Sequence, residues 1–496
     1  MTESEVARIV SSLSNSPSVD IYGLNSKVVK ATLHVILPYL TNLINNMFEQ
    51  AEWPEILKVS RVLPIFKKGD ESDLGSYRPI AIIPIFAKIA EIALNNRLID
   101  FFNSFKIFSA NQFGFRRGRS TISAVIEIVG GIVEGVDEGL HSEAILCDLT
   151  KAFDCVSHVI LCQKLEFYGV RGKPLRLLQS YLEGRQQCVK LGNKVSALTH
   201  ISHGIPQGSV LGPTLFNIYI NDLPNYMSPI CGSKLYADDT TLLFNSSNIE
   251  HLDIMAEEAL RWAEYWFHSN KLKLNQLKTQ TIKFTTRRTC QNQQPVNLLG
   301  IVLDAHLQWD CHVDYLCKKL SSSLFLLRSL KRCLSIDMVL RSYYAFFHSK
   351  LSYGIMLWGN HTAAKRVLIM QKKAIRVIYN LKYREHCKPY FRLSGVMTVP
   401  AVYLFYSLVH IHDTRDCYRT HADVHSHYTR HRHNIMTSRH RLSLTQRNSL
   451  QLALYNILPS SWKASTLRIF KSKLKNYLTD NPIYDVRDFP PTALPQ

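Results

Sequence analysis

The chain has 496 residues, 46% of them hydrophobic, so we expect most of it to fold, into about two to four domains. No run of about 18 uncharged apolar residues occurs and the N-terminal residues carry acids, so neither a membrane-spanning helix nor a signal peptide is expected. The 11 cysteines form no CxxC pair. This pattern indicates reduced thiols in an intracellular protein, nuclear or cytoplasmic, rather than a disulfide framework or a zinc ribbon.

The net charge of +20 lies entirely in residues 311–496, whereas residues 1–310 carry equal numbers of acidic and basic side chains. This asymmetry favours a catalytic front part and a back part that binds a polyanion such as nucleic acid. A basic surface that is merely solvated is the alternative.

The pattern of apolar residues predicts the elements in chain order. We expect helices over 1–60 that stop at Trp53-Pro54, strands at 61–66 and 79–86, a helix over 87–102, a helix after Thr121, a strand at 143–149, helices over 155–183, a hairpin at 186–203, a helix from Thr214, an apolar run at 233–244 broken by a turn, and an amphipathic helix over 250–269. From about residue 312 the pattern is mostly helical, and the proline-rich tail 486–496 is expected to be loose.

Three aspartates interrupt the most apolar runs. Asp148 ends the run AILCDL, and Asp238 and Asp239 sit inside LYADDTTLLF. An unpaired buried charge costs several kcal/mol, and a divalent cation removes that cost because Mg²⁺ prefers carboxylate and phosphate oxygens. If the two strands are neighbours, the aspartates could hold two metal ions about 3.5–4 Å apart for phosphoryl transfer. An Asp-Asp hairpin turn and a strand-end aspartate that caps a helix are the alternative.

Residues 204–213, GIPQGSVLGP, contain three glycines and two prolines and lead into the apolar run TLFNIYI. The composition predicts a tight loop that opens a helix. Glycine lets the backbone approach a ligand closely, and the free N–H groups at a helix start can bind a phosphate or a base. An ordinary turn is the alternative.

The order and spacing of seven blocks resemble the reverse transcriptases of non-LTR (LINE-type) retrotransposons, most closely the jockey-like group. The blocks, within roughly residues 60–310, are SRVLPIFKKGDESDLGSYRPIAIIPIFAKIAE, NQFGFRRGRST, AILCDLTKAFDCVSH, GIPQGSVLGPTLFNIYINDLP, LYADDTTLLF, WFHSNKLKLNQLKTQTIKF and LLGIVLDAHLQWDCHV. The resemblance implies an α+β fold of the right-hand polymerase type, with fingers, palm and thumb and a mostly helical, basic C-terminal region. We expect a helical N-terminal extension at 1–59, a catalytic domain of fingers and palm at 60–303, a basic helical thumb at 304–400 and a helical, histidine-rich region at 401–496.

The resemblance also implies the site residues. The catalytic residues, which would bind Mg²⁺ or Mn²⁺, are Asp148, Asp238 and Asp239. The nucleotide-binding residues are Lys67, Lys68, Arg78, Phe153, Gln207, Gly208 and Lys278. Among these, Phe153 would exclude a ribose 2′-hydroxyl, and Lys278 would give a proton to pyrophosphate; a core phenylalanine and a surface lysine are the alternatives. The template contacts are Arg116, Arg117 and Arg119, although a solvated loop is nearly as good an interpretation.

The implied activity is RNA-directed DNA polymerisation, with an RNA template, a DNA primer and deoxynucleoside triphosphates as partners and no membrane. We expect the endonuclease and RNase H regions of the family to be missing. The segment between Lys278 and Leu299 is shorter than in the family, which puts the primer grip in doubt. The second hypothesis is therefore a catalytically inactive, nucleic-acid-binding remnant, and the third is an intron maturase or another template-copying polymerase.

Eight histidines lie between residues 410 and 440, accompanied by Cys417 alone. Their spacing fits no zinc finger. We interpret them as a basic, pH-sensitive surface that contacts RNA, with an adventitious metal site as the alternative.

Overall fold

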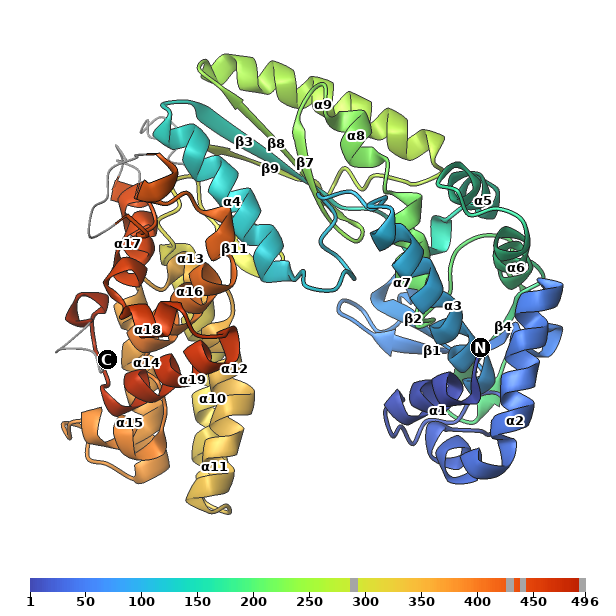
Figure 1. Cartoon of the computed structure of the whole chain (residues 1–496), viewed down its shortest axis with the longest axis horizontal. Helices are drawn as coiled ribbons and strands as arrows, with labels where there is room; N and C mark the ends of the chain where they lie inside the picture. Colours follow the sequence, from blue (N-terminus) through green and yellow to red (C-terminus); the bar gives the residue numbers. More distant parts are fainter. Residues whose placement is uncertain (286–292, 425–431, 438–442, 490–496) are drawn as a thin grey trace. The chain divides into compact units, whose positions relative to one another are not determined.

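The computed structural model describes residues 1–285, 293–424, 432–437 and 443–489. The chain divides into two compact units. Unit 1 comprises Met1–Ala124, Ala144–Phe244 and Asp253–Gln280, and unit 2 comprises Val125–Glu143, Asn245–Leu252 and Thr281–Gln496. The sheets that carry the predicted site residues lie mainly in unit 1, and unit 2 is mostly helical (Figure 1).

Unit 1 begins with the helices α1 (Glu3–Ser12) and α2 (Ser26–Gln50). Asn25 caps α2 by accepting hydrogen bonds from the N–H groups of Lys27 and Val28, as asparagine commonly does at a helix start. The helix ends at Ala51, just before Trp53-Pro54, as predicted. The Trp53 ring is buried edge-on against Tyr181, with ring centroids 4.9 Å apart, which ties the end of the N-terminal helices to the helix α6 (Lys173–Leu182).

A five-stranded sheet follows, with order β2-β1-β4-β5 and β6 paired to β4. Its strands are β1 (Val59–Phe66), β2 (Tyr77–Ile82), β4 (Gln186–Leu191), β5 (Lys194–Val195) and β6 (Thr199–His200). The predicted hairpin at 186–203 is confirmed by the antiparallel pairs of β4. The predicted strand 79–86 is wrong at its end, because Pro84 starts the helix α3 (Ile85–Ser104).

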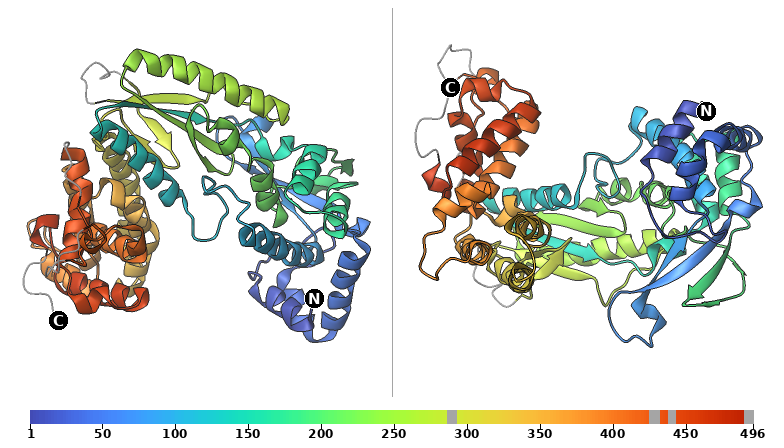
Figure 2. Two further views of the ribbon diagram at one scale, coloured as in Figure 1. Left: turned by 45° about the horizontal axis from the view of Figure 1, so that its top comes forward. Right: turned by 90° about the horizontal axis from the view of Figure 1, so that it is seen from below.

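A second sheet has the order β7-β8-β3-β9. Its strands are β3 (His141–Cys147), β7 (Gly232–Tyr236), β8 (Asp239–Ser246) and β9 (Gln280–Phe284). The amphipathic helix α9 (Ile249–Ser269) runs alongside this sheet in both Figure 1 and Figure 2. Its buried residues, such as Ala259, Ala263 and Phe267, face the core. The strand and helix predictions for this part of the chain are confirmed.

The remaining helices up to residue 230 connect these sheets. They are α4 (Thr121–Asp137), the 3₁₀ turn η3 (Ala152–Cys155), α5 (His158–Phe167), α6 (Lys173–Leu182), α7 (Leu211–Tyr219) and α8 (Leu223–Met227); shorter 3₁₀ turns lie at Glu55–Leu57 and Leu74–Ser76. α7 starts three residues before the predicted Thr214, inside residues 204–213, which are called the glycine-rich loop from here on.

The larger part of unit 2 starts with the hairpin β10 (Val296–Leu298) and β11 (Ile301–Leu303). Helices then follow in chain order: α10 (Asp310–Lys331), α11 (Ile336–Tyr343), the π-helical turn η5 (Tyr344–His348), α12 (Ser349–Ser352), α13 (Ile355–Trp358), α14 (Ala364–Tyr379), α15 (Lys388–Ser394), α16 (Val399–Asp413), α17 (Ser443–Ile457), α18 (Ser460–Lys463) and α19 (Leu467–Asp480), with 3₁₀ turns at Arg415–Cys417, His421–Asp423 and Val486–Asp488. The prediction of a mostly helical back part is confirmed. The loose tail predicted at 486–496 lies largely outside the described residues.

Among the described helices, none is by itself long and apolar enough to cross a membrane. The bent pair of α15 and α16 passes the same length and composition test when the two helices are taken together.

Candidate active site

Asp148 follows directly after the buried strand β3. Its loop is paired with the segment after α9: the N–H of Asn275 donates to the carbonyl of Asp148 (2.8 Å) and the N–H of Thr150 donates to the carbonyl of Lys273 (2.9 Å). This pairing brings Lys278 to Asp148, with 3.5 Å between Nζ and Oδ2. Two blocks far apart in the sequence therefore meet at one carboxylate.

Asp238 and Asp239 lie at the turn of the hairpin formed by β7 and β8. Tyr236 and Asp239 are the last paired residues, so Ala237 and Asp238 form a two-residue loop. Ala237 has φ of 55°, in the left-handed region that such tight hairpin loops require. The predicted Asp-Asp turn is confirmed, and β8 begins at Asp239 itself.

The three aspartates share one electrostatic environment, since β8 and β3 are neighbouring strands. Desolvation and the charges of Asp238 and Asp148 raise the pKa of Asp239 to about 6, although the residue is solvent-exposed. Desolvation likewise raises the pKa of Asp238, with a further contribution from Asp148. Like charges held this close favour protonation or a bound cation.

The side chains of Asp148, Asp238 and Asp239 fit a divalent metal by their chemistry. They are three clustered carboxylates, and a bound cation would relieve their mutual repulsion. The arrangement is not a preformed ligand cage. Within the described part of the chain, no three His, Cys, Asp or Glu side chains are arranged to hold a metal ion. Asp148 instead points one carboxylate oxygen toward Lys278. Metal binding would therefore require carboxylate side chains to turn.

The predicted nucleotide contacts Phe153 and Gln207 are both held at the short turn η3 that follows Asp148. Phe153 is half-buried and its ring stacks on Phe216 of α7, with centroids 4.6 Å apart and an interplanar angle of 18°. The side-chain amide of Gln207 donates from Nε2 to Oδ1 of Asp154 (3.0 Å). Phe153 and Asp154 are consecutive residues of η3, so one short turn supports both contacts.

The glycine-rich loop is packed tightly against β2. The N–H of Ala81 donates to the carbonyl of Gln207 (2.7 Å). Gly208 has φ of 119°, and a Cβ at this position would lie 2.6 Å from the carbonyl oxygen of Ala81, so only glycine fits. A cavity of about 280 Å³ is bordered by Gln207, by Asp154 and by residues of β1, β2, β4 and β6.

The basic residues of the β1–β2 hairpin act on the same carboxylates. Arg78 pairs with Ile65 across the hairpin, and Lys67 and Lys68 lie exposed just beyond β1. The charges of Arg78 and Lys67 offset part of the rise in the pKa of Asp238, and Lys67 offsets part of the rise in the pKa of Asp239. The structure therefore places two of these three cations within electrostatic range of the aspartates.

Residues 65–303, which contain all of these features, match the family model described as reverse transcriptase (RNA-dependent DNA polymerase). This part of the chain is a reverse transcriptase domain. The family match confirms the α+β, right-hand polymerase fold class. The division of the chain at residues 59, 303 and 400, which bounds the catalytic domain at 60–303, stays a prediction.

Curated relatives confirm the resemblance to the jockey-like group. The chain is 30% identical to "Probable RNA-directed DNA polymerase from transposon BS" of Drosophila melanogaster, over 76% of this chain and 44% of the relative. It is 27% identical to "RNA-directed DNA polymerase from mobile element jockey" of the same species, again over 76% and 44%. The chain thus spans under half the length of these relatives. Among solved structures, telomerase from Candida albicans is similar with a TM-score of 0.40 and 12% identity, over 69% of this chain and 66% of that one.

The loop of the reverse transcriptase domain that carries the predicted template contacts is braced by its own arginines. Arg116 donates from Nη1 to the carbonyl of Ser109 (2.6 Å), and its guanidinium lies over the Phe108 ring. Arg119 donates to the carbonyl of Ala110 and lies over the ring of Phe113, with 4.6 Å to the centroid. Arg117 is exposed. Arg116 and Arg119 therefore hold the loop, whatever else they contact.

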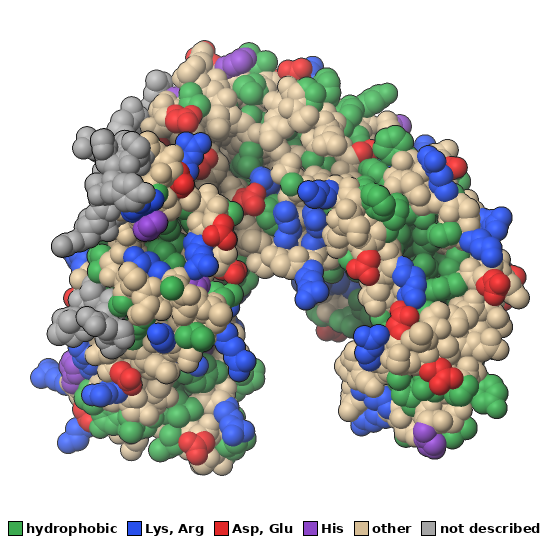
Figure 3. Space-filling view, in the orientation of Figure 1, with side chains coloured by type: hydrophobic (Ala, Val, Ile, Leu, Met, Phe, Trp, Pro, Cys, Tyr) green, Lys and Arg blue, Asp and Glu red, His purple; other side chains and the backbone are tan. Residues whose placement is uncertain are grey.

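In unit 2, one face of α10 presents cations and an aromatic ring to solvent. The exposed residues at helical spacing are Lys318, Ser321, Phe325 and Arg328, and Arg332 continues the same spacing at the C-cap of the helix. Phe325 is 70% exposed. On the face drawn in Figure 3, the Lys and Arg side chains of unit 2 are interspersed with apolar and uncharged ones.

The histidine-rich region is only partly described, since His425, His427, His431 and His440 lie outside the described residues. His412 is buried, stacks on Phe470 with ring centroids 4.0 Å apart and hydrogen-bonds Tyr455 and the carbonyl of Ser465. The interpretation of an RNA-contact surface is wrong for His412, because its ring belongs to the core. Most of the short segment that follows Lys278 and β9 also lies outside the described residues.

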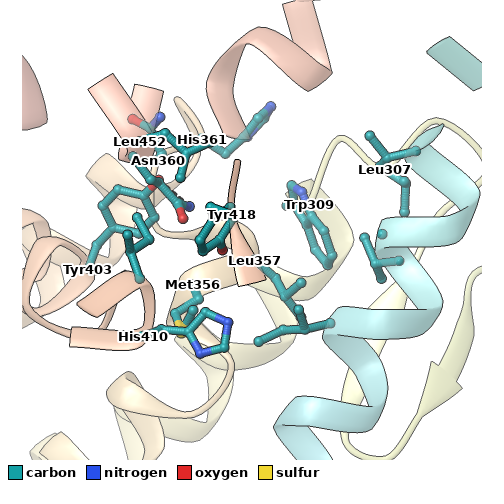
Figure 4. Close-up of a pocket in the computed structure, with 16 residues that line it drawn as sticks. Leu307, Trp309, Met356, Leu357, Asn360, His361, Tyr403, His410, Tyr418 and Leu452 are labelled. Carbon is teal, nitrogen blue, oxygen red and sulfur yellow. Dashed lines mark hydrogen bonds between the residues drawn. The ribbon is translucent and has the colours of Figure 1, made fainter. Parts of the chain in front are cut away.

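Unit 2 contains a separate cavity of about 230 Å³. Figure 4 shows Trp309 and Tyr418 pointing into it, and Asn360 beside Tyr403. Among the described residues that line it, none is Asp, Glu, Lys or Arg. This lining differs in its chemistry from the aspartate cluster.

Several residues that position the site were not predicted. Asp154 orients Gln207, Glu91 accepts hydrogen bonds at the start of α7, and Gln112 contacts the hairpin turn. The blocks AFD, KIAE and NQFG contain them, but their neighbours in space come from distant parts of the chain. The one usable signal was Gly114 of NQFG, since a glycine in such a loop often marks close backbone approach.

Proposed function

We propose that this chain is an RNA-directed DNA polymerase of a non-LTR retrotransposon, which extends a DNA primer along an RNA template with deoxynucleoside triphosphates in the presence of Mg²⁺ or Mn²⁺. The observation that supports this most strongly is the meeting of Asp148, Asp238, Asp239 and Lys278 within the reverse transcriptase domain. The names of the curated relatives agree with it.

In the proposed reaction, the primer 3′-hydroxyl oxygen attacks the α-phosphorus of the bound nucleotide, and the bond to the oxygen that bridges to the β-phosphorus breaks. Bound divalent metal would supply charge neutralisation of the phosphates and activation of the hydroxyl. The hydroxyl proton passes to solvent, and the Nζ of Lys278 gives a proton to the leaving pyrophosphate. Arg78 and Lys67 would bind phosphate oxygens, as their charges at the aspartate cluster suggest.

Phe153 would select the sugar. Its ring is supported from behind by Phe216, so it cannot easily move aside for a 2′-hydroxyl. Gln207 would contact the nucleotide through its side-chain oxygen, because Asp154 already accepts from its Nε2. Because Nε2 of Gln207 is engaged by Asp154, Oε1 of Gln207 remains available to accept a hydrogen bond from the nucleotide.

The test is primer extension at low salt with Mg²⁺, on an RNA template and in parallel on a DNA template. The wild type should extend the primer on RNA, and the Asp238→Asn, Asp239→Asn double variant should not. The absence of extension by the wild type, at protein concentrations that saturate the template–primer, would contradict the proposal.

A second candidate is a nucleic-acid-binding protein without catalysis. The observation that favours it is the lack of a preformed three-carboxylate ligand set among the described residues. This candidate would be supported if the wild type and the Asp238→Asn, Asp239→Asn double variant both bound template–primer in a salt-sensitive manner and neither extended the primer.

A further inference from the structure

Residues 111–113 precede the loop that carries Arg116, Arg117 and Arg119, here called the arginine loop, and they are joined to the hairpin that carries Asp238 and Asp239. The N–H of Leu235 donates to the carbonyl of Asn111 (2.9 Å), and the N–H of Phe113 donates to the carbonyl of Leu235 (2.8 Å). These bonds add residues 111–113 alongside β7, on the strand that leads into the turn. All of the residues involved belong to unit 1.

Gln112, at the centre of this segment, is fully buried, with 0% of its surface exposed. Its Oε1 accepts a hydrogen bond from the N–H of Ala237 (3.1 Å) and another from the N–H of Gly114 (2.7 Å). Ala237 is the left-handed residue of the turn, with φ of 55°. An alanine in this conformation is strained, and it persists only where the surroundings hold it.

Gly114 completes the contact. A Cβ at this position would lie 2.3 Å from the backbone nitrogen of Ala237 and 3.0 Å from the carbonyl carbon of Tyr236, so any side chain would displace the turn. The carbonyl of Gly114 accepts a hydrogen bond from Nδ2 of Asn217 (2.8 Å), and Asn217 is buried in α7. The turn is therefore in contact with the Gln112 amide and with Gly114, and Gly114 is itself held by a hydrogen bond from α7.

We infer that Gln112 is a positioning residue for the metal-binding turn: its Oε1 holds Ala237 in the left-handed conformation and thereby sets where Asp238 and Asp239 point. The inference rests on the proposed function, which makes these aspartates metal ligands. The arginine loop begins two residues after Gly114. The inference therefore also implies that this loop and the hairpin turn move together as one rigid unit.

Replacement of Gln112 by methionine tests this, since methionine has a similar length and lacks the acceptor oxygen. The binding of Mn²⁺ would be measured by electron paramagnetic resonance of the free ion, without nucleic acid. Gln112→Met should weaken the Asp238-dependent binding by about 10–100-fold, the range typical for loss of a group that orients a metal ligand. The matched control, Gln163→Met on the exposed face of α5, should bind Mn²⁺ as the wild type does.

A rescue experiment separates positioning from general destabilisation. Ala237→Gly removes the strain of the left-handed conformation, so the Gln112→Met, Ala237→Gly double variant should regain part of the lost Mn²⁺ affinity. Thermal unfolding of each variant shows whether the fold is intact. If Gln112→Met does not fold, Gly114→Ala disturbs the same contact from the other side and should weaken Mn²⁺ binding in the same way.

Equal Mn²⁺ affinity of Gln112→Met and the wild type would overturn the inference, as would a wild type with no Asp238-dependent binding. A loss that Ala237→Gly leaves fully unrelieved would also count against it. A wild type that binds Mn²⁺ in this manner but extends no primer would contradict the proposed function alone.

Discussion

At the scale of single residues, the site depends on charged groups placed at the ends of buried strands. Desolvation and the like charges of Asp238 and Asp148 raise the pKa of Asp239 to about 6. Lys278 and Lys67 offset part of this repulsion. Such opposed environments are typical of sites where charge develops during a reaction.

The Phe153 ring is the residue-scale feature with the most specific consequence. Phe153→Val should raise the ratio of ribonucleotide to deoxynucleotide incorporation by at least about tenfold, because the smaller side chain leaves room for the 2′-hydroxyl. The ratio would be measured from kcat/KM for each nucleotide in primer extension.

Phe216→Leu should change the same ratio in the same direction but less, since it removes only the ring on which Phe153 stacks. The control is Phe167→Val, because Phe167 is 81% exposed and lies at the end of α5. An unchanged ratio in Phe153→Val would show that this ring does not select the sugar.

At the scale of elements, the glycine-rich loop and α7 depend on a buried carboxyl. Glu91, in the middle of α3, is 0% exposed, and its Oε2 accepts from the N–H of Val210 (2.6 Å) and the N–H of Leu211 (3.3 Å). The hydroxyl of Tyr181 donates to its Oε1 (3.0 Å). Glu91 therefore satisfies donors at a helix start that would otherwise be buried without partners.

Glu91→Leu should lower the free energy of unfolding by about 2–4 kcal/mol, because buried N–H groups lose their acceptor. Glu91→Gln keeps an acceptor oxygen and a donor for Tyr181, so it should remain within about 1 kcal/mol of the wild type. Urea denaturation at a fixed pH measures both. A Leu variant as stable as the Gln variant would show that the cap contributes little.

The stability should also depend on pH through the same residue. Burial raises the pKa of Glu91 above its ordinary value of 4.5, opposed by the charge of Arg185 and the N–H donors. The folded state then keeps a proton that the unfolded chain loses. The contribution of Glu91 to stability is therefore greatest at low pH and falls as pH rises through the raised pKa, by up to about 1.4 kcal/mol per pH unit.

Glu91→Gln should flatten this decline, which denaturation series at several pH values would reveal. Glu5→Gln serves as the control. The hydrogen bond from the Arg97 side chain lowers the pKa of Glu5, so this replacement should not flatten the decline of stability with rising pH. A pH profile identical in wild type and Glu91→Gln would assign the dependence to another group.

At the scale of the whole molecule, the charge of +20 is carried by the part of the chain that includes α10. The exposed face of α10 combines Lys318, Arg328 and Arg332 with Phe325, which suits phosphate contact beside a base or sugar. The affinity for an RNA–DNA duplex should fall by about 10³-fold or more between 50 and 200 mM salt if six or more phosphates are contacted.

Arg328→Glu, Arg332→Glu should weaken duplex binding and flatten its salt dependence. Lys471→Glu, Lys475→Glu on α19 changes the net charge by the same amount and should have a smaller effect, since it lies outside that face. Fluorescence anisotropy of a labelled duplex across a salt series measures both. Equal effects of the two variants would mean that overall charge, and not the α10 face, governs binding.

Much of this protein could be predicted from local patterns. The strand β3, the amphipathic α9 and the hairpin that contains Asp238 follow from periodicity and turn chemistry, because those signals act between residues a few positions apart. The end of β2 could not be predicted as easily: the apolar run continues past Ile82, and only the placement of Pro84 at the start of α3 divides it.

The sequence by itself determined the strand-end aspartates, the basic back part and the family to which residues 65–303 belong, since these are carried by residue order and composition. The tertiary structure alone decided that Lys278 meets Asp148, that Asp154 orients Gln207, that Glu91 caps α7 and that Gln112 holds Ala237. Each of these contacts joins segments separated by many residues. Hydrogen bonds of this kind depend on how strands and helices pack, and packing is a property of the whole fold.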